Sequence, residues 1–331
     1  MAAGDRGDKN DVVSTPRAVG VRISYADVPT AVTGWVEARL GSPVVSYADQ
    51  VGGMSPGCAT RVVCADGTRA FVKAVGADLN AHTPTLFRRE IAVLDLIGEH
   101  PLWARLEASY DDGDWVALVL EDVEGRHPDL SDDVVMGRLL EATDDLSVVL
   151  GERTPREIAT GGGTYDTGLT GQHSIFRQFA DSVETLTEIP DAPVPAWVRA
   201  DTAGWAKKIR TLAEHPMTTL VHYDIRVDNL LQRPTGEIVF VDWGGAGIGP
   251  DWIDPLLARL ERVDQGWFDA SLASSEALVR IGDEAVTTWL VGIGTHLAVR
   301  SVTAVDVNLP TLQEFRRTES ARFLGAAARR L

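Results

Sequence analysis

Three small oxygen-bearing side chains lie in one short apolar segment of the sequence, VHYDIRVDNLLQRPTGEIVFVDWGG (residues 221–245). Asp224 and Asn229 follow the strand-like run TTLVHYD, and Asp242 ends a second such run, EIVFVDW. Because the RPTG between them predicts a turn, we interpret the two runs as a hairpin that brings the three side chains together. An Asp–Asn pair can bind a hard cation such as magnesium, which also keeps waters or substrate phosphates. A third, metal-free carboxylate could accept a proton from an attacking hydroxyl.

The elements around this segment change character once along the chain. Residues from about 43 to 75 are strand-like, and Asp66-Gly67 predicts a two-residue hairpin turn between β-branched runs. A helix is expected from Pro84, because proline suits a first turn and apolar residues then recur at helical spacing. After a last apolar strand in WVALVLEDVEG (115–125), helical patterns dominate, beginning with a helix capped by Ser131. The sequence therefore predicts a small β-rich part followed by a large, mainly helical part.

Composition and charge restrict the classes of function. The chain has 331 residues, of which 44% are hydrophobic and 24% charged, as expected of an ordinary soluble globular protein. The formal net charge of −17 argues against nucleic acid as a partner, since phosphate backbones attract basic surfaces. Residues 121–331 carry most of the acidic excess, with 33 acidic and 20 basic residues. This excess would favour a cationic small molecule, although an acidic surface can also serve solubility alone.

No segment of the sequence predicts a membrane span or a secretion signal. The longest charge-free apolar stretch, residues 285–299, is shorter than the roughly 18 to 20 residues of a transmembrane helix, so we expect a buried helix there. Residues 1–19 are charged and are expected to form a flexible tail. Cys58 and Cys64 are too few for a disulfide framework or a closed zinc site, and they fit a reduced cytoplasmic location.

The opening segment resembles one enzyme superfamily. HYDIRVDN matches the H-x-D-x-x-x-x-N loop of the protein-kinase-like superfamily, and VFVDWGGAGIGP resembles the metal-binding segment of its aminoglycoside phosphotransferase and choline kinase branch. The likeness extends from about residue 45 to residue 331. It implies an α+β, protein-kinase-like two-lobed fold, with a small β-rich lobe and a larger, mainly helical lobe. We expect the N-terminal nucleotide-binding lobe at 20–120, a hinge at 121–126, and the helical catalytic and substrate lobe at 127–331.

The resemblance also implies roles for five residues of the segment. Asp224 would be the catalytic base, and Asn229 and Asp242 would hold magnesium. His222 would support the loop that carries Asp224. Arg226 stands where protein kinases have a phosphate-side lysine, so it would touch the transferred phosphoryl group, and a structural salt bridge is an equal alternative. For the other four residues the alternatives are turn, strand-end and core positions without catalytic function.

The first lobe contains candidates for the other parts that a kinase needs, a lysine on a strand and a glutamate on the next helix. Lys73 lies in AFVKAV with apolar residues on both sides, where an unpaired ammonium would be costly. Glu90 lies beside the apolar stripe of the following helix and can reach a cation on the sheet. We therefore expect a Lys73–Glu90 pair that binds the nucleotide phosphates. The alternative is that Lys73 extends to solvent and Glu90 lies on an exposed face.

The stretch GGMSPG (52–57) is the expected loop over the nucleotide phosphates, with Gly53 and Gly57 letting the backbone approach and Ser55 offering a hydroxyl. Its spacing departs from the G-x-G-x-x-G of protein kinases. The same residues satisfy G-x-S-x-G, the nucleophile elbow of α/β-hydrolases. That reading is disfavoured because Pro56 has no backbone N–H to serve an oxyanion and because a hairpin, not a helix, is expected to follow.

The hinge would lie in LEDVEG, where backbone groups of Glu121, Asp122 and Val123 would bind the purine of ATP or GTP. The expected reaction is magnesium-dependent transfer of the γ-phosphate to a hydroxyl group of an aminoglycoside, another amino sugar or a cationic antibiotic. One alternative is a kinase of a metabolite, such as a neutral sugar or a choline-like amino alcohol. An alternative of another class is a kinase-like protein that binds its ligand without catalysis. The oligomeric state is not predicted.

Overall fold

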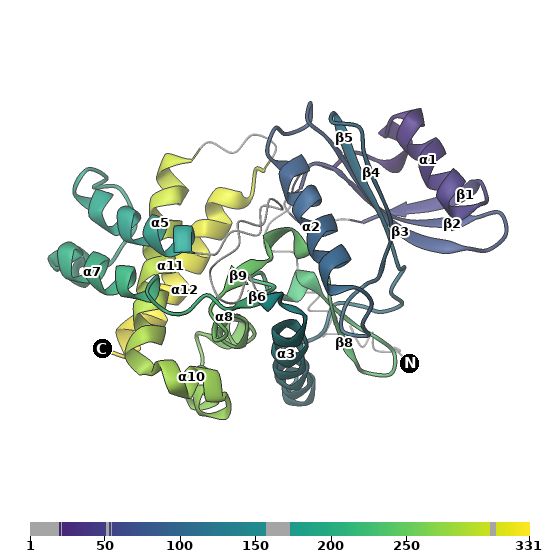
Figure 1. The fold of residues 1–331 in the computed structure, drawn as a ribbon. Coiled ribbons are helices and arrows are strands. Elements are labelled where there is room, and N and C mark those ends of the chain that lie inside the picture. The colour runs from purple at the N-terminus through teal and green to yellow at the C-terminus, as the bar shows by residue number, and fades with distance from the viewer. Residues whose placement is uncertain (1–19, 21, 51–52, 54, 157–172, 305–308) are drawn as a thin grey trace, which may run out of the picture.

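The structure of the protein is a computed structural model that describes residues 20, 22–50, 53, 55–156, 173–304 and 309–331. The expected tail at 1–19 lies outside the described residues. Two lobes of different composition stand side by side in Figure 1. The elements of the first lobe are β1 (Val44–Asp49), β2 (Cys58–Cys64), β3 (Arg69–Gly76), β4 (Leu106–Asp111), β5 (Trp115–Leu120), α1 (Thr30–Leu40) and α2 (Thr83–Ile97).

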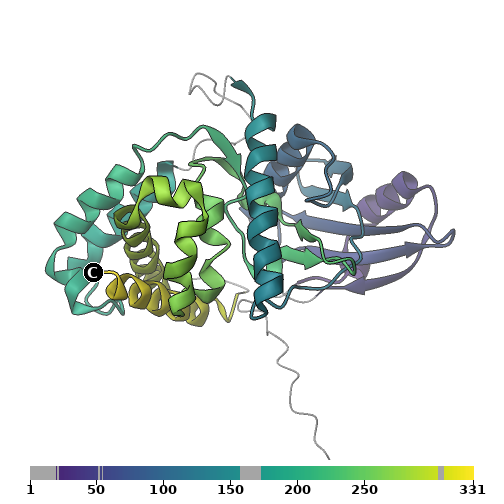
Figure 2. The ribbon, with the colours of Figure 1, turned by 90° about the horizontal axis from the view of Figure 1, so that it is seen from below.

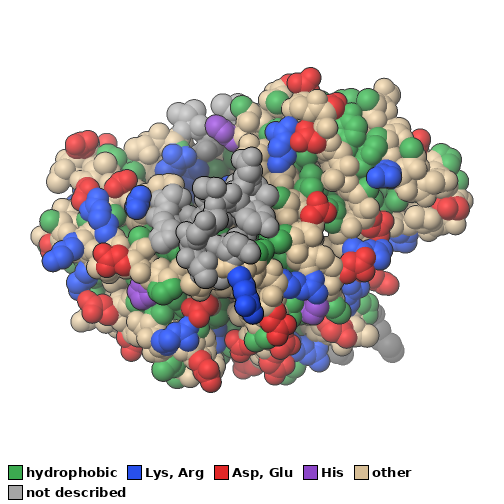
Figure 3. All heavy atoms as spheres, viewed as in Figure 1, with side chains coloured by type: hydrophobic (Ala, Val, Ile, Leu, Met, Phe, Trp, Pro, Cys, Tyr) green, Lys and Arg blue, Asp and Glu red, His purple; other side chains and the backbone are tan. Residues whose placement is uncertain are grey.

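The second lobe is mainly helical, as the sequence pattern predicts. Its helices are α3 (Asp133–Arg153), α5 (His173–Glu184), α6 (Ala196–Ala200), α7 (Thr202–Leu212), α8 (Ile253–Leu257), α9 (Gly266–Ser271), α10 (Glu276–Ile281), α11 (Asp283–Thr303) and α12 (Leu312–Arg329). Its short strands are β6 (Thr219–Val221), β7 (Leu230–Gln232), β8 (Ile238–Phe240) and β9 (Gly247–Gly249). Acidic and basic side chains intermingle over both lobes on the face shown in Figure 3.

The first lobe is built on a five-stranded antiparallel sheet with the strand order β1-β2-β3-β5-β4. The turn at Asp66-Gly67 joins β2 to β3 as predicted, and Gly67 adopts the left-handed φ of 89° that such turns require. Successive residues of β3 face opposite sides of the sheet, so that Val72 packs toward α1 while Val75 packs toward α2. Both faces are therefore covered, and Lys73 points to the α2 side.

The helix expected after Ser131 is present as α3, but its cap differs from the prediction. The side chain of Asp132, not that of Ser131, accepts hydrogen bonds from the backbone N–H groups of Val134 and Val135. The Ser131 hydroxyl instead donates to Asp129 at 2.6 Å. A carboxylate that accepts two N–H groups is the stronger cap, since it also complements the positive end of the helix dipole. Figure 2 shows α3 running between the two lobes.

The predicted pairing around the catalytic segment is wrong in one respect. The strand before the RPTG turn that pairs with β8 is β7, and β6 pairs with β9 instead. The reason is local, because residues 230–232 lie next to the turn and reach residues 238–240 by closing only a short loop. Asp224 follows the end of β6 by three residues and Asp242 follows the end of β8 by two, close to the strand ends that the prediction gave them.

The apolar stretch at 285–299 forms most of α11, and many of its residues are buried, as predicted. It packs against α5, α7 and α12 at the end of the molecule away from the sheet (Figure 1). Among the described residues, no helix combines the length and the apolar character that crossing a membrane requires.

Candidate active site

The loop between β6 and β7 is held by a buried carboxylate that the sequence reasoning did not assign. Asp254, the residue after the start of α8, accepts hydrogen bonds from the backbone N–H of His222 at 2.7 Å and of Tyr223 at 2.9 Å. Tyr223 has a φ of 63°, a left-handed conformation that is costly for a bulky residue. The two hydrogen bonds from Asp254 stabilise this turn, which presents Asp224 at its end.

His222 joins the same loop to the end of β8. Its side chain is fully buried, its Nε2 donates to the carbonyl of Val241 at 3.1 Å, and its Nδ1 accepts from the backbone N–H of Asp224 at 3.3 Å. Burial lowers the pKa of His222, so the imidazole is neutral, as this donor–acceptor pattern requires. His222 therefore joins the backbone at Asp224 to the backbone at Val241, the residue before Asp242.

Asp224 and Asn229 face each other across the loop. The Asn229 side-chain amide donates to the Asp224 carboxylate at 2.8 Å and to the Asp224 carbonyl at 2.9 Å. Burial raises the pKa of Asp224 to about 6, although the nearby charge of Arg226 opposes the rise. The carboxylate is thus ionised at neutral pH but binds a proton more readily than an ordinary aspartate.

The predicted Lys73–Glu90 pair is present and includes a third residue. Lys73 Nζ lies 2.5 Å from Glu90 and 3.0 Å from Asp242, with the Lys73 and Glu90 side chains only 8% and 1% exposed. Burial acts against the charge on Lys73, but the two carboxylates outweigh it and raise the pKa of Lys73. The ammonium in turn lowers the pKa of Asp242. Asp242 adopts a left-handed φ of 67° and is 48% exposed, so its carboxylate is accessible from the space between the lobes.

The donor set of Asn229 and Asp242 fits magnesium. Because the Asn229 amide nitrogen donates to Asp224, its oxygen is the atom left for a cation, and Asp242 supplies a carboxylate in the same cleft. Two protein oxygens suit an ion that keeps waters and substrate phosphates. Among the described residues no group of three or more His, Cys, Asp or Glu side chains could form a denser metal site.

A cleft between the lobes, the inter-lobe cleft, has one charged and one apolar end. Lys73, Asn229 and Asp242 line it at the charged end. The other end is lined by small and apolar side chains, namely Ala59, Phe71, Ala104, Leu120, Leu231 and Val241. Three of them, Ala104, Leu231 and Val241, pack in one cluster with Val123. This polarity matches a nucleotide, whose base is flat and weakly polar and whose phosphates are anionic.

The connection between the lobes also lines this cleft. Glu121, Asp122 and Val123 all border it, as the hinge prediction places them. The Asp122 side chain points to Arg61 and Arg69, at 2.7 Å from each. The backbone N–H of Val123 donates to the carbonyl of Glu121 at 3.1 Å. The hinge is therefore ordered by its own side chains and backbone.

The expected phosphate-covering loop is only partly described. Gly53 lines the inter-lobe cleft with a φ of 76°. Ser55 accepts a hydrogen bond from the N–H of Gly57 at 3.2 Å, and Gly57 packs so closely on β3 that a Cβ would lie 2.4 Å from the Ala74 carbonyl. Strand β2 follows this turn directly, so the strand–serine–helix arrangement of a hydrolase nucleophile elbow is not formed.

Arg226 is held by its own loop. Its guanidinium makes two hydrogen bonds to Asp228, one of them at 2.5 Å from Nε, and it lies 5.4 Å from the ring centre of Phe315. The salt bridge left open by the sequence is therefore formed. Arg226 also lines the second cavity of the site, so a structural and a substrate-facing role are compatible.

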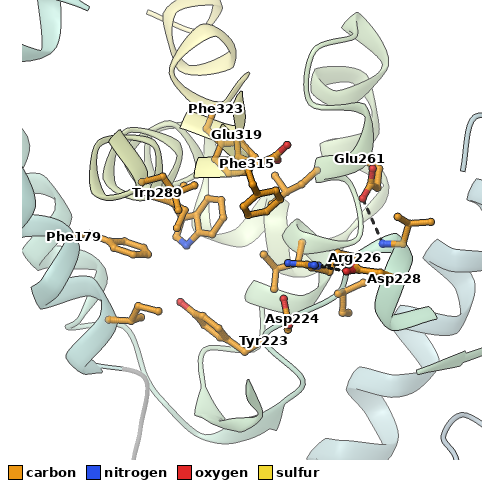
Figure 4. Close-up of a pocket in the computed structure, with 17 residues that line it drawn as sticks. Phe179, Tyr223, Asp224, Arg226, Asp228, Glu261, Trp289, Phe315, Glu319 and Phe323 are labelled. Carbon is orange, nitrogen blue, oxygen red and sulfur yellow. Dashed lines mark hydrogen bonds and ion pairs between the residues drawn. The ribbon is translucent and has the colours of Figure 1, made fainter. Parts of the chain in front are cut away.

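This second cavity, the aromatic pocket, lies in the helical lobe and is drawn in Figure 4. Its floor includes Asp224, and α11 and α12 supply much of its wall. Twelve of its seventeen lining residues are apolar or aromatic. The aromatic members are Phe179, Tyr223, Trp289, Phe315 and Phe323. Val227 and Asp228 line both cavities, so the aromatic pocket and the inter-lobe cleft adjoin at the catalytic segment.

Comparisons with known proteins agree with this geometry. The model of the phosphotransferase enzyme family matches residues 61–274, well over half of the chain. No curated protein sequence matches the chain. Choline kinase LicA from Streptococcus pneumoniae has a similar structure, with a TM-score of 0.56 and 12% identity over 90% of this chain and 98% of that chain.

Two aminoglycoside phosphotransferases have similar structures as well. ADP-bound APH(2'')-Ib gives a TM-score of 0.53 and 13% identity over 89% of this chain and 99% of that chain. The streptomycin–ATP–APH(2'')-IIa complex gives a TM-score of 0.53 and 13% identity over 90% of this chain and 99% of that chain. At such identities the likeness establishes the protein-kinase-like two-lobed fold. With this fold and the family match, the chain belongs to the phosphotransferase enzyme family and is a small-molecule phosphotransferase.

Proposed function

We propose that the protein transfers the γ-phosphate of ATP or GTP to a hydroxyl group of a small molecule, with Asp224 as the base. The observation that carries the proposal is that Asp224 lines the aromatic pocket while its hydrogen-bond partner Asn229 lines the inter-lobe cleft. A hydroxyl bound in the pocket would therefore meet a phosphate bound in the cleft at this pair of residues. Phosphoryl transfer needs such an alignment more than it needs covalent chemistry.

The charged end of the inter-lobe cleft suits the phosphates of the donor. Lys73, kept protonated by Glu90 and Asp242, would bind phosphate oxygens, and the backbone at Gly53 would cover them. Asn229 and Asp242 would hold magnesium, which neutralises phosphate charge when bound. The apolar end beside Glu121, Asp122 and Val123 would hold the purine. Nucleotide binding is also supported by the ADP that a structure with the same fold contains.

The loop residues would then act on the acceptor. Asp224 would accept a hydrogen bond from the acceptor hydroxyl and take its proton, and a pKa of about 6 suits a base that works near neutral pH. His222 and Asp254 would fix the loop backbone and make no contact with the substrate. Arg226 would stabilise negative charge on the transferred phosphoryl group from the side of the aromatic pocket.

The acceptor is expected to carry an amine. Four carboxylates line the aromatic pocket, Asp224, Asp228, Glu261 and Glu319, against one guanidinium, that of Arg226. An anionic acceptor would be repelled by this excess, and a cationic one would be attracted. Aminoglycosides, other amino sugars, cationic antibiotics and amino alcohols satisfy this requirement. A neutral sugar is the less favoured alternative.

The test is a phosphorylation screen with ATP and GTP, with and without magnesium, against aminoglycosides, amino sugars, amino alcohols and neutral sugars. Asp224→Asn serves as the blank because it keeps the shape of the side chain and removes the base. We expect magnesium-dependent phosphate transfer that the blank abolishes. If the wild-type protein bound neither nucleotide in the presence of magnesium, the proposal would be refuted.

A further inference from the structure

We propose, on the basis of the function above, that the acceptor is an alcohol with a largely apolar, ring-containing body, at most one positive charge, and a further oxygen that accepts a hydrogen bond. This inference narrows the acceptor within the amine-bearing molecules and separates it from polycationic amino sugars. It rests on the lining of the aromatic pocket, on the charges there, and on two polar atoms that lack partners.

The walls of the aromatic pocket are suited to an apolar body. Helices α5, α11 and α12 supply aromatic and aliphatic side chains to the pocket, and Glu319 is the one charged residue that they contribute to its lining. Figure 4 shows Trp289, Phe315 and Phe323 gathered on this wall, and the rings of Trp289 and Phe323 lie 6.2 Å apart. Water is poorly held against such a wall, so a ring that displaces it gains the free energy of apolar burial.

Two of the pocket carboxylates are already compensated by arginines. Asp228 accepts from Arg226, and both oxygens of Glu319 accept from Arg322 Nη1 at 2.9 Å. Asp224, as the proposed base, would accept its hydrogen bond from the acceptor hydroxyl and not from an ammonium group. A polycationic sugar would place several ammonium groups against apolar walls without a carboxylate for each, which is costly. One positive charge is therefore the most that the pocket favours.

Two buried polar atoms of the pocket wall have no hydrogen-bond partner. Trp289 is 2% exposed, and its indole Nε1, like the Tyr223 hydroxyl, is buried without a hydrogen-bond partner. In Figure 4 the indole nitrogen of Trp289 and the phenol oxygen of Tyr223 lie on the same side of the pocket and point toward one another. Trp289 lies close enough to the Tyr223 hydroxyl to oppose the rise that burial causes in its pKa, but the two atoms do not meet hydrogen-bond geometry. A ligand oxygen between them would satisfy both atoms, and buried polar atoms normally find such a partner.

The first experiment compares matched probes on the protein saturated with magnesium and a non-hydrolysable ATP analogue. 2-(Benzylamino)ethanol and 2-(methylamino)ethanol share the hydroxyl and the amine and differ in the ring, and kanamycin is the polycation. We expect the ring to tighten binding by about tenfold or more, as burial of a ring of this size implies, and kanamycin to bind more weakly than the ring-bearing probe. The opposite order, or no gain from the ring, would overturn the inference.

Variants locate the effect in the pocket. Ile293→Ser makes the pocket wall more polar and should reduce the gain in affinity that the ring provides. Val279→Ser, at an exposed position on α10, is the control and should leave that gain unchanged. Trp289→Phe keeps the aromatic wall and removes the N–H. The variant should bind N-(2-hydroxyethyl)benzamide about fivefold more weakly, because the carbonyl of this probe can accept that hydrogen bond. Its affinity for 2-(benzylamino)ethanol should not change.

The outcomes separate this inference from the proposed function. If the protein bound the nucleotide with magnesium but bound none of the ring-bearing probes at millimolar concentration, the acceptor class would be refuted. The proposed kinase function would not be affected. Failure to bind the nucleotide at all would refute the proposed function itself. If Trp289→Phe lowered the affinity for both ring-bearing probes equally, the indole would contribute only apolar contact, and the proposed hydrogen bond to a ligand oxygen would be refuted.

A second, independent observation concerns Arg22, which the sequence reasoning did not single out. Residues next to it pair with the glycine loop, since Gly20 N–H donates to Gly53 at 2.9 Å and Ile23 N–H donates to Pro56 at 3.2 Å. Arg22 Nη1 itself donates to the Gly57 carbonyl at 3.3 Å, and its guanidinium lies so close to Gly53 that a Cβ there would clash. This short segment therefore carries Arg22 into the lining of the inter-lobe cleft.

We infer that Arg22 binds the phosphates of the donor nucleotide. Its guanidinium lies at the glycine loop and lines the same cleft as Asp242, whose carboxylate favours the charged form of Arg22. Burial lowers the pKa of Arg22, which marks a cation held in a poorly hydrated place where an anionic ligand gains most. A guanidinium can donate two parallel hydrogen bonds to one phosphate, whereas the Lys73 ammonium already pairs with Glu90 and Asp242.

Arg22→Gln tests this role against Arg39→Gln, an exposed arginine on α1. We expect Arg22→Gln to lower the affinity for magnesium–ATP about tenfold or more, because the phosphates lose a charge-assisted hydrogen-bond partner. The affinity for adenosine, which has no phosphates, should stay unchanged. Arg39→Gln should change neither. Equal weakening of ATP and adenosine would mean that Arg22 only shapes the loop, and an unchanged affinity for ATP would likewise overturn the inference.

Discussion

The Asn229 amide donates to both the carboxylate and the backbone carbonyl of Asp224, at 2.8 and 2.9 Å. These two bonds fix the amide so that its nitrogen faces Asp224 and its oxygen faces away. One residue therefore orients the proposed base and offers a magnesium ligand. The pair explains why the spacing of Asp224 and Asn229 matters, because the turn between them brings residues five positions apart into contact.

Asp224→Asn should separate activity from stability. We expect the rate of phosphate transfer to fall by roughly 100-fold or more, since the base is lost, while the affinity for the nucleotide stays nearly constant. A rate within a few-fold of wild type would contradict the assignment of the base.

The same substitution should stabilise the fold at neutral pH. Burial raises the pKa of Asp224 from 3.8 to about 6, so the folded state binds the proton more tightly than the unfolded chain. Ionised Asp224 therefore destabilises the fold, by about 3 kcal/mol at most, and this cost is present in full above about pH 6 and absent below about pH 4. Urea unfolding of both proteins at pH 8 and pH 4 checks this, because the advantage of the variant should disappear at pH 4.

The pH dependence of catalysis follows from the same group. A base must be ionised to accept a proton, so kcat/KM should fall about tenfold per pH unit below about pH 6 and level off above it. Burial lowers the pKa of His222, so any transition of its imidazole is displaced to lower pH than that of an ordinary histidine. A profile that is flat from pH 5 to pH 8 would argue against Asp224 as the group that titrates.

Asp254→Asn tests the support of the catalytic loop. An asparagine has one acceptor oxygen, so one of the two N–H groups that Asp254 now satisfies, those of His222 and Tyr223, would lose its partner. We expect kcat to fall about tenfold while the KM for ATP changes less than twofold, since Asp254 contacts neither substrate. A change in KM alone would mean that Asp254 shapes the inter-lobe cleft instead of positioning Asp224.

Much of the first lobe could be predicted because its signals are local. The turn at Asp66-Gly67 and the helix beginning near Pro84 depend on residues adjacent in the sequence, and both are present. Helix α1 was not predicted, because Val32 and Val36 are its only buried residues and Gly34 lies between them. Its formation depends on covering the sheet, which short-range patterns do not report.

The candidate site shows the same division between local and tertiary information. Asp224, Asn229 and Asp242 could be proposed because one continuous segment carries them all. Asp254 acts on a residue 32 positions away, and only the packing of α8 against the catalytic loop brings it there. The pairing of β6 was mistaken for a similar reason, since its partner β9 lies beyond the hairpin that the turn signal indicated.

Asp242→Asn should weaken nucleotide binding in a magnesium-dependent way. The variant loses the charge of a proposed metal ligand, so we expect the affinity for ATP to become nearly insensitive to magnesium, while the affinity in EDTA changes little. Asp251→Asn is the matched control, because Asp251 is a half-exposed aspartate paired with Arg280 on the surface. If magnesium still tightened ATP binding in Asp242→Asn as it does in wild type, Asp242 would not be a ligand.

The buried pair of Lys73 and Glu90 allows its structural and catalytic contributions to be separated. Lys73→Met should remove phosphate transfer and cost about 3–5 kcal/mol of unfolding free energy, because Glu90 would remain buried without its partner. Adding Glu90→Gln removes the stranded charge, so the double variant should regain most of the stability and none of the activity. Lys208→Met, in an exposed pair, should change stability by less than about 1 kcal/mol. Recovered activity in the double variant would show that Lys73 serves the fold and not the donor phosphates.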